Sequence, residues 1–244
     1  MHVTPAEARA FAGIFLARVP AAAGRTLAFF PSAVALEAAA AVFHRRDDVI
    51  VGAQDVHWEP KGAFTGATSV ALAAGAGAKC ALVGHSERRH VFGETDADTR
   101  RKVRAIFDGG LIPFLCVGEK LAEREAGQTT AVVLRQLDAA INGLSSSELG
   151  RLVVAYEPVW AIGTGKNATP DDASEVHSAI RTALGPAVVP ILYGGSVNKG
   201  NVAALLSRPG IDGVLVGGAS LDAAGWAEVV NLGTQAKVDS EAKA

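Results

Sequence analysis

The sequence is poor in cysteine and in net charge, and both shortages exclude classes of protein. Only two cysteines, Cys80 and Cys116, occur in 244 residues, and both lie in apolar runs. This excludes a disulfide framework and predicts buried, reduced thiols. No set of His, Cys and carboxylate residues has the spacing of a zinc site, so we expect no metal. The formal net charge of -2 gives no general attraction to nucleic acid or anionic lipid.

Long apolar runs and the residue pattern of a leader sequence are also missing from these residues. No uninterrupted run approaches the ~20 residues that a membrane-spanning helix needs. The N-terminus has no basic segment followed by an apolar core, so we expect no signal peptide. The chain is nevertheless 49% apolar, which is enough for a large core. We therefore expect one cytoplasmic domain over residues 1–244, with a polar tail at 233–244 that frays.

Short apolar runs alternate with helix-like segments, which is typical of an α/β protein with a parallel sheet. Several runs are continuous rather than alternating, as expected for parallel strands that are covered on both faces. The expected strands are Leu27–Phe30, Val49–Ala53, Ala81–Gly84, Ile112–Val117, Leu152–Tyr156, Pro190–Tyr193 and Gly213–Val216. A βα barrel closes with eight strands. We therefore expect either a further strand before Met1 or another element in its place.

Capping patterns mark several helix starts. Thr4-Pro5-Ala6-Glu7 has the form of a capping box with proline in the first turn, and Thr169-Pro170-Asp171-Asp172 repeats it. The helix expected after Thr95 is acidic at its start and basic further on, which matches the helix dipole. We also expect Ser32 to cap a helix that runs through Arg45.

The most informative stretch is Tyr156–Lys166, which reads Tyr-Glu-Pro-Val-Trp-Ala-Ile-Gly-Thr-Gly-Lys. Glu157 directly follows an expected buried strand, and a loop with a stiff proline start and a glycine-rich end follows it. A carboxylate at the C-terminal end of a barrel strand, beside a loop that can close, suits a catalytic base. Without these neighbours, a lone glutamate after a strand is usually a solvated loop residue.

A histidine stands at another strand end, in the segment Gly84-His85-Ser86-Glu87-Arg88-Arg89. If this segment begins a helical turn, its N-terminus disfavours a cation. A neutral His85 could then donate a hydrogen bond to a substrate carbonyl oxygen. The alternatives are a structural histidine and, for Glu87, an ordinary acidic residue at a helix start.

Two glycine-rich segments follow the last two expected strands, and they contain Gly194-Gly195-Ser196 and Gly217-Gly218. With one leading strand added, these strands become numbers seven and eight. Many βα barrels bind phosphate at those two positions through backbone amides. Ser196, Gly217 and Gly218 are therefore candidate phosphate contacts, and Gly163 would let the preceding loop approach closely. The alternative for each is an ordinary tight turn.

These four segments, in this order, resemble the triosephosphate isomerase family, and the resemblance extends from Met1 to about Leu232. It implies a (β/α)8 TIM barrel, with seven strands evident in the chain. It also implies an isomerase of glycolysis and gluconeogenesis that needs no cofactor or metal. The implied reaction interconverts D-glyceraldehyde 3-phosphate and dihydroxyacetone phosphate through an enediolate. The same resemblance implies that Glu157 moves the proton, that a neutral His85 polarises the carbonyl, and that Glu87 is a supporting carboxylate.

The long loop Asp55–Gly66 contains aromatic residues that suggest a buried partner surface. It resembles the family's interdigitating loop, whose threonine reaches into the active site of the neighbouring subunit. Thr65 takes that place here, which implies a homodimer. The alternative is a lid within one subunit.

The resemblance also concerns the start of the chain. Met1–Glu7 resembles the family sequence that begins at the end of an Asn-x-Lys-Met pattern, so the first-strand Asn-x-Lys segment has no counterpart here. One alternative is therefore a catalytically impaired barrel relative that binds phosphorylated ligands. A further alternative is another phosphate-binding barrel isomerase or lyase. In that case the sequence motifs around Glu157 and His85 would have to arise by chance.

Overall fold

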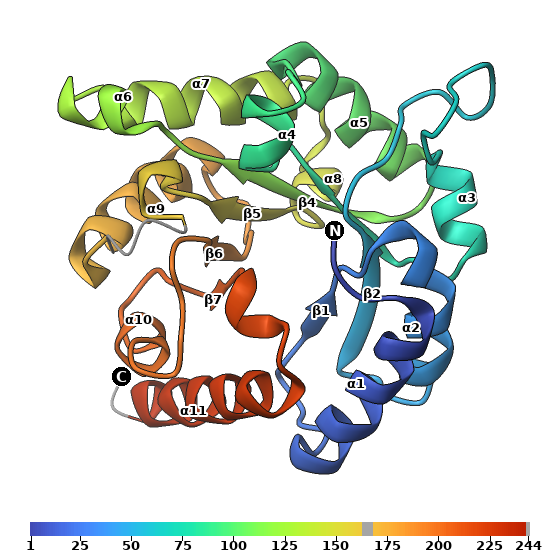
Figure 1. Cartoon of the computed structure of the whole chain (residues 1–244). Coiled ribbons are helices and arrows are strands. Elements are labelled where there is room, and N and C mark those ends of the chain that lie inside the picture. Colours follow the sequence, from blue (N-terminus) through green and yellow to red (C-terminus); the bar gives the residue numbers. More distant parts are fainter. Residues whose placement is uncertain (163–167, 243–244) are drawn as a thin grey trace.

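The computed structural model describes residues 1–162 and 168–242, in which strands and helices alternate around a curled parallel sheet (Figure 1). Among these described residues, the sheet has seven strands in sequence order. The strands are β1 (Leu27–Phe29), β2 (Val49–Ala53), β3 (Cys80–Val83), β4 (Ile112–Val117), β5 (Val153–Tyr156), β6 (Ile191–Tyr193) and β7 (Gly213–Val214). All seven expected strands are thus confirmed, with ends that differ by at most two residues. The fold is that of a TIM barrel, of which seven strands lie within the part of the chain that the structure describes.

The register of the sheet aligns the carboxyl ends of its central strands. Val117 of β4 is level with Tyr156 of β5, which is level in turn with Tyr193 of β6. The residues that follow these strands therefore emerge side by side at one edge of the sheet. The candidate catalytic residues lie at this edge, as expected for an α/β barrel.

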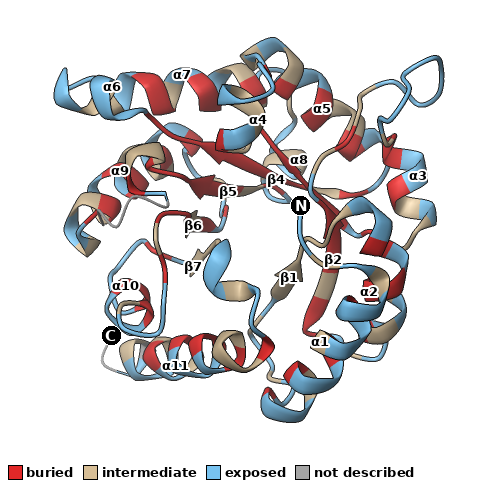
Figure 2. Ribbon diagram, in the orientation of Figure 1, coloured by how far each residue is buried: buried red, intermediate tan, exposed pale blue. Residues whose placement is uncertain are grey.

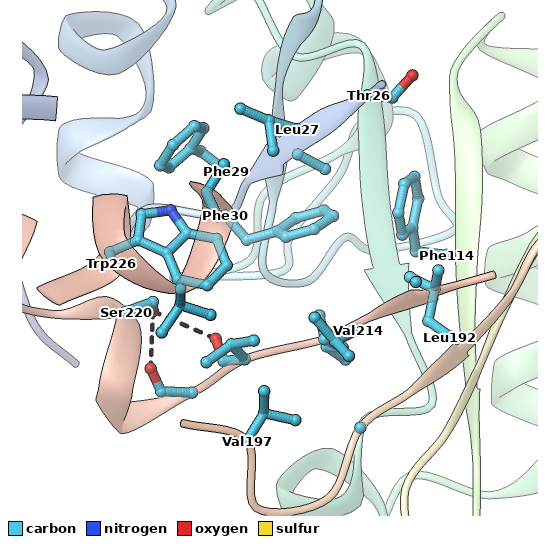
Figure 3. A pocket seen from close by; sticks show the side chains of 18 of the residues that line it. Thr26, Leu27, Phe29, Phe30, Phe114, Leu192, Val197, Val214, Ser220 and Trp226 are labelled. Carbon is cyan, nitrogen blue, oxygen red and sulfur yellow. Dashed lines mark hydrogen bonds between the residues drawn. The ribbon is translucent and has the colours of Figure 1, made fainter. Parts of the chain in front are cut away.

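The two outer strands of the sheet do not pair with each other. Among the described residues, β1 pairs only with β2, and β7 pairs only with β6. The sheet is therefore a half-barrel, open between β1 and β7. A cavity of about 1440 Å³ lies in this opening. Figure 3 shows its apolar wall, which includes Leu27, Phe29, Phe30, Phe114, Leu192, Val214 and Trp226.

The longer helices lie outside the sheet and turn their buried faces towards it (Figure 2). The α-helices are α1 (Pro5–Arg18), α2 (Leu36–Phe43), α3 (Val70–Gly75), α4 (Ser86–His90), α5 (Asp96–Asp108), α6 (Leu121–Glu125), α7 (Thr129–Ile141), α8 (Ser146–Leu149), α9 (Pro170–Leu184), α10 (Val202–Leu206) and α11 (Ala223–Glu241). The 3-10 turns found in residues 1–162 and 168–242 are η1 (Ala33–Ala35), η2 (Val159–Ala161) and η3 (Gly218–Ser220). Within the described ranges, no helix is both long and apolar enough to cross a membrane.

The predicted capping boxes at Thr4 and Thr169 are confirmed, and Thr95 forms another with Asp98. The prediction for Ser32 is wrong. Its hydroxyl donates a hydrogen bond of 2.8 Å to the carbonyl of Val3 and caps no helix. A 3-10 turn follows Ser32, and α2 begins only at Leu36 and ends at Phe43.

The last helix covers most of the segment that was expected to fray. Helix α11 continues to Glu241, so residues 233–241 are helical. A Cβ atom on Gly233 would lie 2.7 Å from Leu206 Cδ1, which shows how closely α11 approaches α10. Lys237 also donates a hydrogen bond to the carbonyl of Ile211. These contacts hold the polar segment against the body of the protein.

The expectation of buried thiols is confirmed. Cys80 and Cys116 are both free and fully buried within the sheet. Burial raises the pKa of Cys80 to about 12. A thiol with so high a pKa stays protonated near neutral pH, so it behaves as a small apolar side chain.

Candidate active site

Glu157 is held between two glycines at the carboxyl edge of the sheet. It follows β5, its side chain is buried, and it lies between Gly118 after β4 and Gly194 after β6. A Cβ atom on Gly118 would overlap the carbonyl oxygen of Glu157, and one on Gly194 would lie 2.8 Å from its Cγ. Its N–H donates to the carbonyl of Val117 at 2.7 Å. Neighbouring strands therefore fix the backbone that carries this carboxylate.

The Glu157 carboxylate reaches across to the segment that follows β3. Its Oε1 lies 3.0 Å from His85 Nε2, and its Oε2 accepts a 2.9 Å hydrogen bond from the N–H of Ser86. His85 is the N-cap of α4, and its Nδ1 accepts a 3.3 Å hydrogen bond from the N–H of Glu87. Because Nδ1 accepts, we assign the proton of the neutral ring to Nε2, which faces Glu157.

The pKa of His85 differs in direction from the sequence-based expectation. Burial alone lowers it, but the hydrogen bond to Glu157 and the charges of Glu157, Glu87 and Glu94 together raise it above the ordinary value. The start of α4 disfavours a charged ring, whereas the Glu157 carboxylate beside the ring favours one. If a substrate oxygen replaces Glu157 at Nε2, the Glu157 contribution weakens and burial again favours the neutral ring.

One cavity brings together most of the predicted site residues. The cavity between β1 and β7 is lined at its carboxyl end by Glu157, His85, Glu87, Ser196, Gly217 and Gly218. Ser196 is half-buried, whereas Gly217 and Gly218 are exposed. Gly163 lies outside the described residues. The described side chains include no group of three or more His, Cys, Asp or Glu that could hold a metal ion.

Short polar contacts shape the two glycine-rich turns. After β7, Ser220 Oγ donates to the carbonyl of Gly217 at 2.7 Å and to that of Val216 at 3.2 Å, as the dashed lines in Figure 3 show. After β6, the side chain of Asn201 donates to the carbonyl of Ser196 at 2.9 Å. These carbonyls are engaged by the protein itself, which fixes the path of both turns at the mouth of the cavity.

Glu87 and Thr65 occupy different positions relative to this cavity. Glu87 is exposed and contacts His85 through its backbone N–H, while its carboxylate acts on His85 by charge. Thr65 is exposed on the loop between β2 and α3, which projects from the body in Figure 1. It does not line the cavity. Any role for Thr65 must therefore involve another chain or a movement of the loop.

The sequence reasoning missed Glu119, a fully buried carboxylate close to the site. Its Oε1 accepts hydrogen bonds from the Tyr156 hydroxyl at 3.2 Å and from Trp160 Nε1 at 2.8 Å. The guanidinium of Arg124 lies 4.5 Å above the Trp160 ring. Burial, followed by the charge of Glu119, raises the pKa of Tyr156 strongly. Glu119 could have been found by the signal that marked Glu157, because it also follows the end of a strand.

A second missed group holds the backbone next to His85. The N–H of Gly84 donates to Glu94 Oε1 at 2.9 Å, and its carbonyl accepts from Arg89 Nε at 2.8 Å. Glu94 is itself paired with the buried ammonium of Lys102. Gly84 has a φ of 71°, which strongly favours glycine. Both peptide groups of this glycine are therefore fixed immediately before His85.

Comparison with known proteins identifies close relatives over nearly the whole chain. The family model described as triosephosphate isomerase matches residues 1–233. The triosephosphate isomerase of Moorella thermoacetica is 47% identical over 238 residues, which cover 95% of this chain and 94% of that protein. That of Synechococcus sp. (strain JA-2-3B'a(2-13)) is 47% identical, with 95% and 93% covered. That of Symbiobacterium thermophilum is 46% identical, with 97% and 95% covered.

Proposed function

Because this chain belongs to the triosephosphate isomerase family, and is an isomerase of D-glyceraldehyde 3-phosphate and dihydroxyacetone phosphate, we propose that Glu157 and His85 carry its chemistry. One observation supports this assignment above the others. The Glu157 carboxylate and His85 Nε2 lie 3.0 Å apart at the wall of one cavity. A base and a hydrogen-bond donor in this arrangement suit proton abstraction next to a carbonyl group.

In the proposed reaction, Glu157 removes the proton from the carbon that bears the hydroxyl group beside the substrate carbonyl. The C–H electron pair forms a carbon–carbon double bond, and the carbonyl oxygen gains the negative charge of an enediolate. A proton then moves between the two oxygens, and Glu157 returns its proton to the neighbouring carbon. The aldose and the ketose are thereby interconverted without net gain or loss of atoms or electrons.

His85 would stabilise the oxygen on which charge develops. Its Nε2–H points towards Glu157 in the structure, and a substrate carbonyl oxygen placed there would accept the same hydrogen bond. A donor fixed in advance is more effective than water because it needs no reorganisation during the reaction. The hydrogen bonds of Gly84 with Glu94 and Arg89 support this role, since they hold the backbone that carries the ring. Glu87 would support the ring by its charge and through its backbone N–H.

The substrate phosphate would bind at the turns that follow β6 and β7. Ser196, Gly217 and Gly218 line the same cavity as Glu157, and a 3-10 turn begins at Gly218. The first N–H groups of a helical turn have no partner inside it, so they can face an anion. Gly163, outside the described residues, remains a candidate contact from the loop side.

The proposal extends to the assembly and its place in the cell. The exposed loop that carries Thr65 presents His57 stacked on Trp58 and against Phe64, with ring centroids 4.2 and 4.1 Å apart. This aromatic surface would pack against a second copy of the chain to form a homodimer. We further propose that the enzyme acts in glycolysis and gluconeogenesis, in the cytoplasm.

Isomerisation in D₂O tests the proton-transfer mechanism. The proton held by a carboxylate base can exchange with solvent, so the product should carry deuterium on carbon. An internal hydride shift would leave that position free of deuterium and would contradict the proposal.

Substitution Ser196→Ala tests the phosphate site in parallel. It should raise KM for the triose phosphate more than it lowers kcat, because a phosphate contact acts in both the ground and transition states.

A further inference from the structure

A buried glutamine joins helix α7 to the strand end beside Glu157. Gln136 is only 4% exposed and belongs to an otherwise apolar helix face. Both polar atoms of its amide contact the same residue. Oε1 accepts a 2.8 Å hydrogen bond from the N–H of Gly118, and Nε2 donates a 3.1 Å hydrogen bond to its carbonyl. The two peptide groups that flank Gly118 are thus fixed by one side chain.

The backbone of Glu157 packs directly against Gly118. Glu157 lies so close that a Cβ atom on Gly118 would be 2.6 Å from its carbonyl carbon. Hydrogen bonds join the two segments on both sides of this contact. The N–H of Glu157 donates to the carbonyl of Val117 at 2.7 Å, and that of Val159 donates to the carbonyl of Glu119 at 3.1 Å. A rotation of the Gly118 peptides would therefore press against Glu157 or break these bonds.

We propose that Gln136 is a positioning residue for Glu157, acting through the Gly118 backbone. The inference rests on the proposed function, in which Glu157 is the base. Gln136 does not line the cavity that contains Glu157 and His85, so it has no contact of its own with a bound substrate. Its effect is to keep the Gly118 peptides in the one orientation that supports the Glu157 backbone. Proton transfer depends steeply on geometry, because a misplacement of 1 Å can cost ~10²-fold in rate.

Kinetic and stability measurements can distinguish a positioning role of Gln136 from a merely structural one. A glutamine that only stabilised the fold would, when replaced, lower the melting temperature and leave kcat unchanged. A positioning residue lowers kcat in the protein that remains folded, with little effect on KM, because substrate binding uses other groups. A loss of kcat at nearly constant KM therefore indicates positioning, whereas a lower melting temperature at constant kcat indicates a structural role.

The test compares Gln136→Met with Val133→Ala in the full chain. Methionine has a similar length but offers neither hydrogen bond, whereas Val133→Ala removes buried volume from the same helix. We expect Gln136→Met to lower kcat by ~10–100-fold with KM within about 2-fold. Val133→Ala should lower the melting temperature and keep kcat within about 2-fold. A Gln136→Met enzyme with the kcat of the control would overturn the proposal.

A second variant keeps the test decisive if Gln136→Met does not fold. A protonated carboxylic acid can accept from the N–H of Gly118 and donate to its carbonyl, as the amide does, whereas a carboxylate can only accept. Gln136→Glu should therefore lose kcat, relative to wild type, as the pH rises through the pKa of the new carboxyl. A pH profile parallel to that of wild type would overturn the positioning role.

The variant Glu157→Gln separates failure of this inference from failure of the proposed function. If Glu157→Gln keeps the kcat of wild type, Glu157 is not the base and both ideas fall. If Glu157→Gln is inactive while Gln136→Met matches the Val133→Ala control, only the positioning role falls. Loss of kcat in both Glu157→Gln and Gln136→Met supports both.

Discussion

His85 Nε2 and Glu157 Oε1 face each other at 3.0 Å, although the two residues come from the ends of strands β3 and β5. Strand β4 lies between these strands, so the side chains meet across the carboxyl edge of the sheet. The contact couples the two groups electrostatically. A change of charge on one residue must shift the proton affinity of the other. Titration of one residue can therefore measure the interaction between the two.

Substitution Glu157→Gln should lower the pKa of His85. In the wild type, burial lowers this pKa, but the Glu157 hydrogen bond and charge, together with the charges of Glu87 and Glu94, outweigh burial and raise it. A neutral amide removes the attraction to the imidazolium and leaves the burial in place, so the pKa must fall. NMR titration of the His85 ring measures the change. Glu175→Gln, an exposed carboxylate on α9, is the control and should have no effect. An unchanged or higher His85 pKa in Glu157→Gln would contradict the account of the pair.

Substitution Gly118→Ala should displace Glu157 and reduce kcat by ~10²-fold or more. The new methyl group would overlap the Glu157 carbonyl, and relief of that overlap requires the backbone to move. Overpacking of this kind costs about 1–3 kcal/mol of stability. Gly13→Ala is a matched control, because nothing lies within 4 Å of its Cβ position in helix α1. Steady-state kinetics and thermal unfolding check both variants, and a fully active Gly118→Ala enzyme would refute the close contact.

The free energy of unfolding should fall as the pH is lowered from about 6.5 towards 4, in part because of His177. Burial is the main cause that lowers the pKa of His177 to about 4. The unfolded chain therefore binds this proton before the folded protein does. The contribution of His177 is complete above its unfolded pKa and is lost as the pH falls. Its size is on the order of 3 kcal/mol, because the pKa falls from an ordinary value of about 6.5 to about 4.

Chemical denaturation at several pH values tests this assignment. His177→Asn can retain a hydrogen bond to the carbonyl of Gly210, which lies 3.0 Å from His177 Nδ1, but it cannot titrate. Its free energy of unfolding should depend less on pH between 4 and 6.5 than that of wild type. His2→Asn, at the exposed N-terminus, should leave the wild-type slope unchanged. Equal slopes for His177→Asn and wild type would contradict the assignment.

Substitution Phe64→Asp should convert the proposed homodimer into a monomer. Phe64 is 44% exposed and packs against His57 in the projecting loop. A charge at the centre of an apolar contact surface would have to lose its hydration on association. Light scattering after size-exclusion chromatography reports the mass. Val188→Asp introduces the same charge at a residue that is 85% exposed elsewhere, and it should keep the mass of the wild type.

The strands and several helix starts could be predicted because their signals are local. Continuous apolar runs such as Ile112–Val117 mark buried strands, and Thr4 and Thr169 accept hydrogen bonds from N–H groups within the same helical turn. Ser32 carries the same kind of residue, but its hydroxyl bonds instead to Val3, which lies far from it in sequence. The choice between a local and a distant partner depends on the tertiary fold.

The candidate site shows the same limit. Glu157 and His85 could be predicted because each follows a strand in a distinctive segment. The direction of the His85 pKa shift could not, because it depends on a contact between those two segments. The helical spacing places Gln136 among buried residues of α7, but no pattern in the sequence shows that its partner is Gly118.

The kcat of Glu157→Gln, measured beside that of Glu175→Gln, tests the central claim most directly. The account predicts a loss of ~10³-fold or more in both directions of the isomerisation, because an amide cannot accept the substrate proton. KM should change little, and Glu175→Gln should match the wild type. A Glu157→Gln enzyme with a kcat within a few-fold of wild type would show that another group is the base.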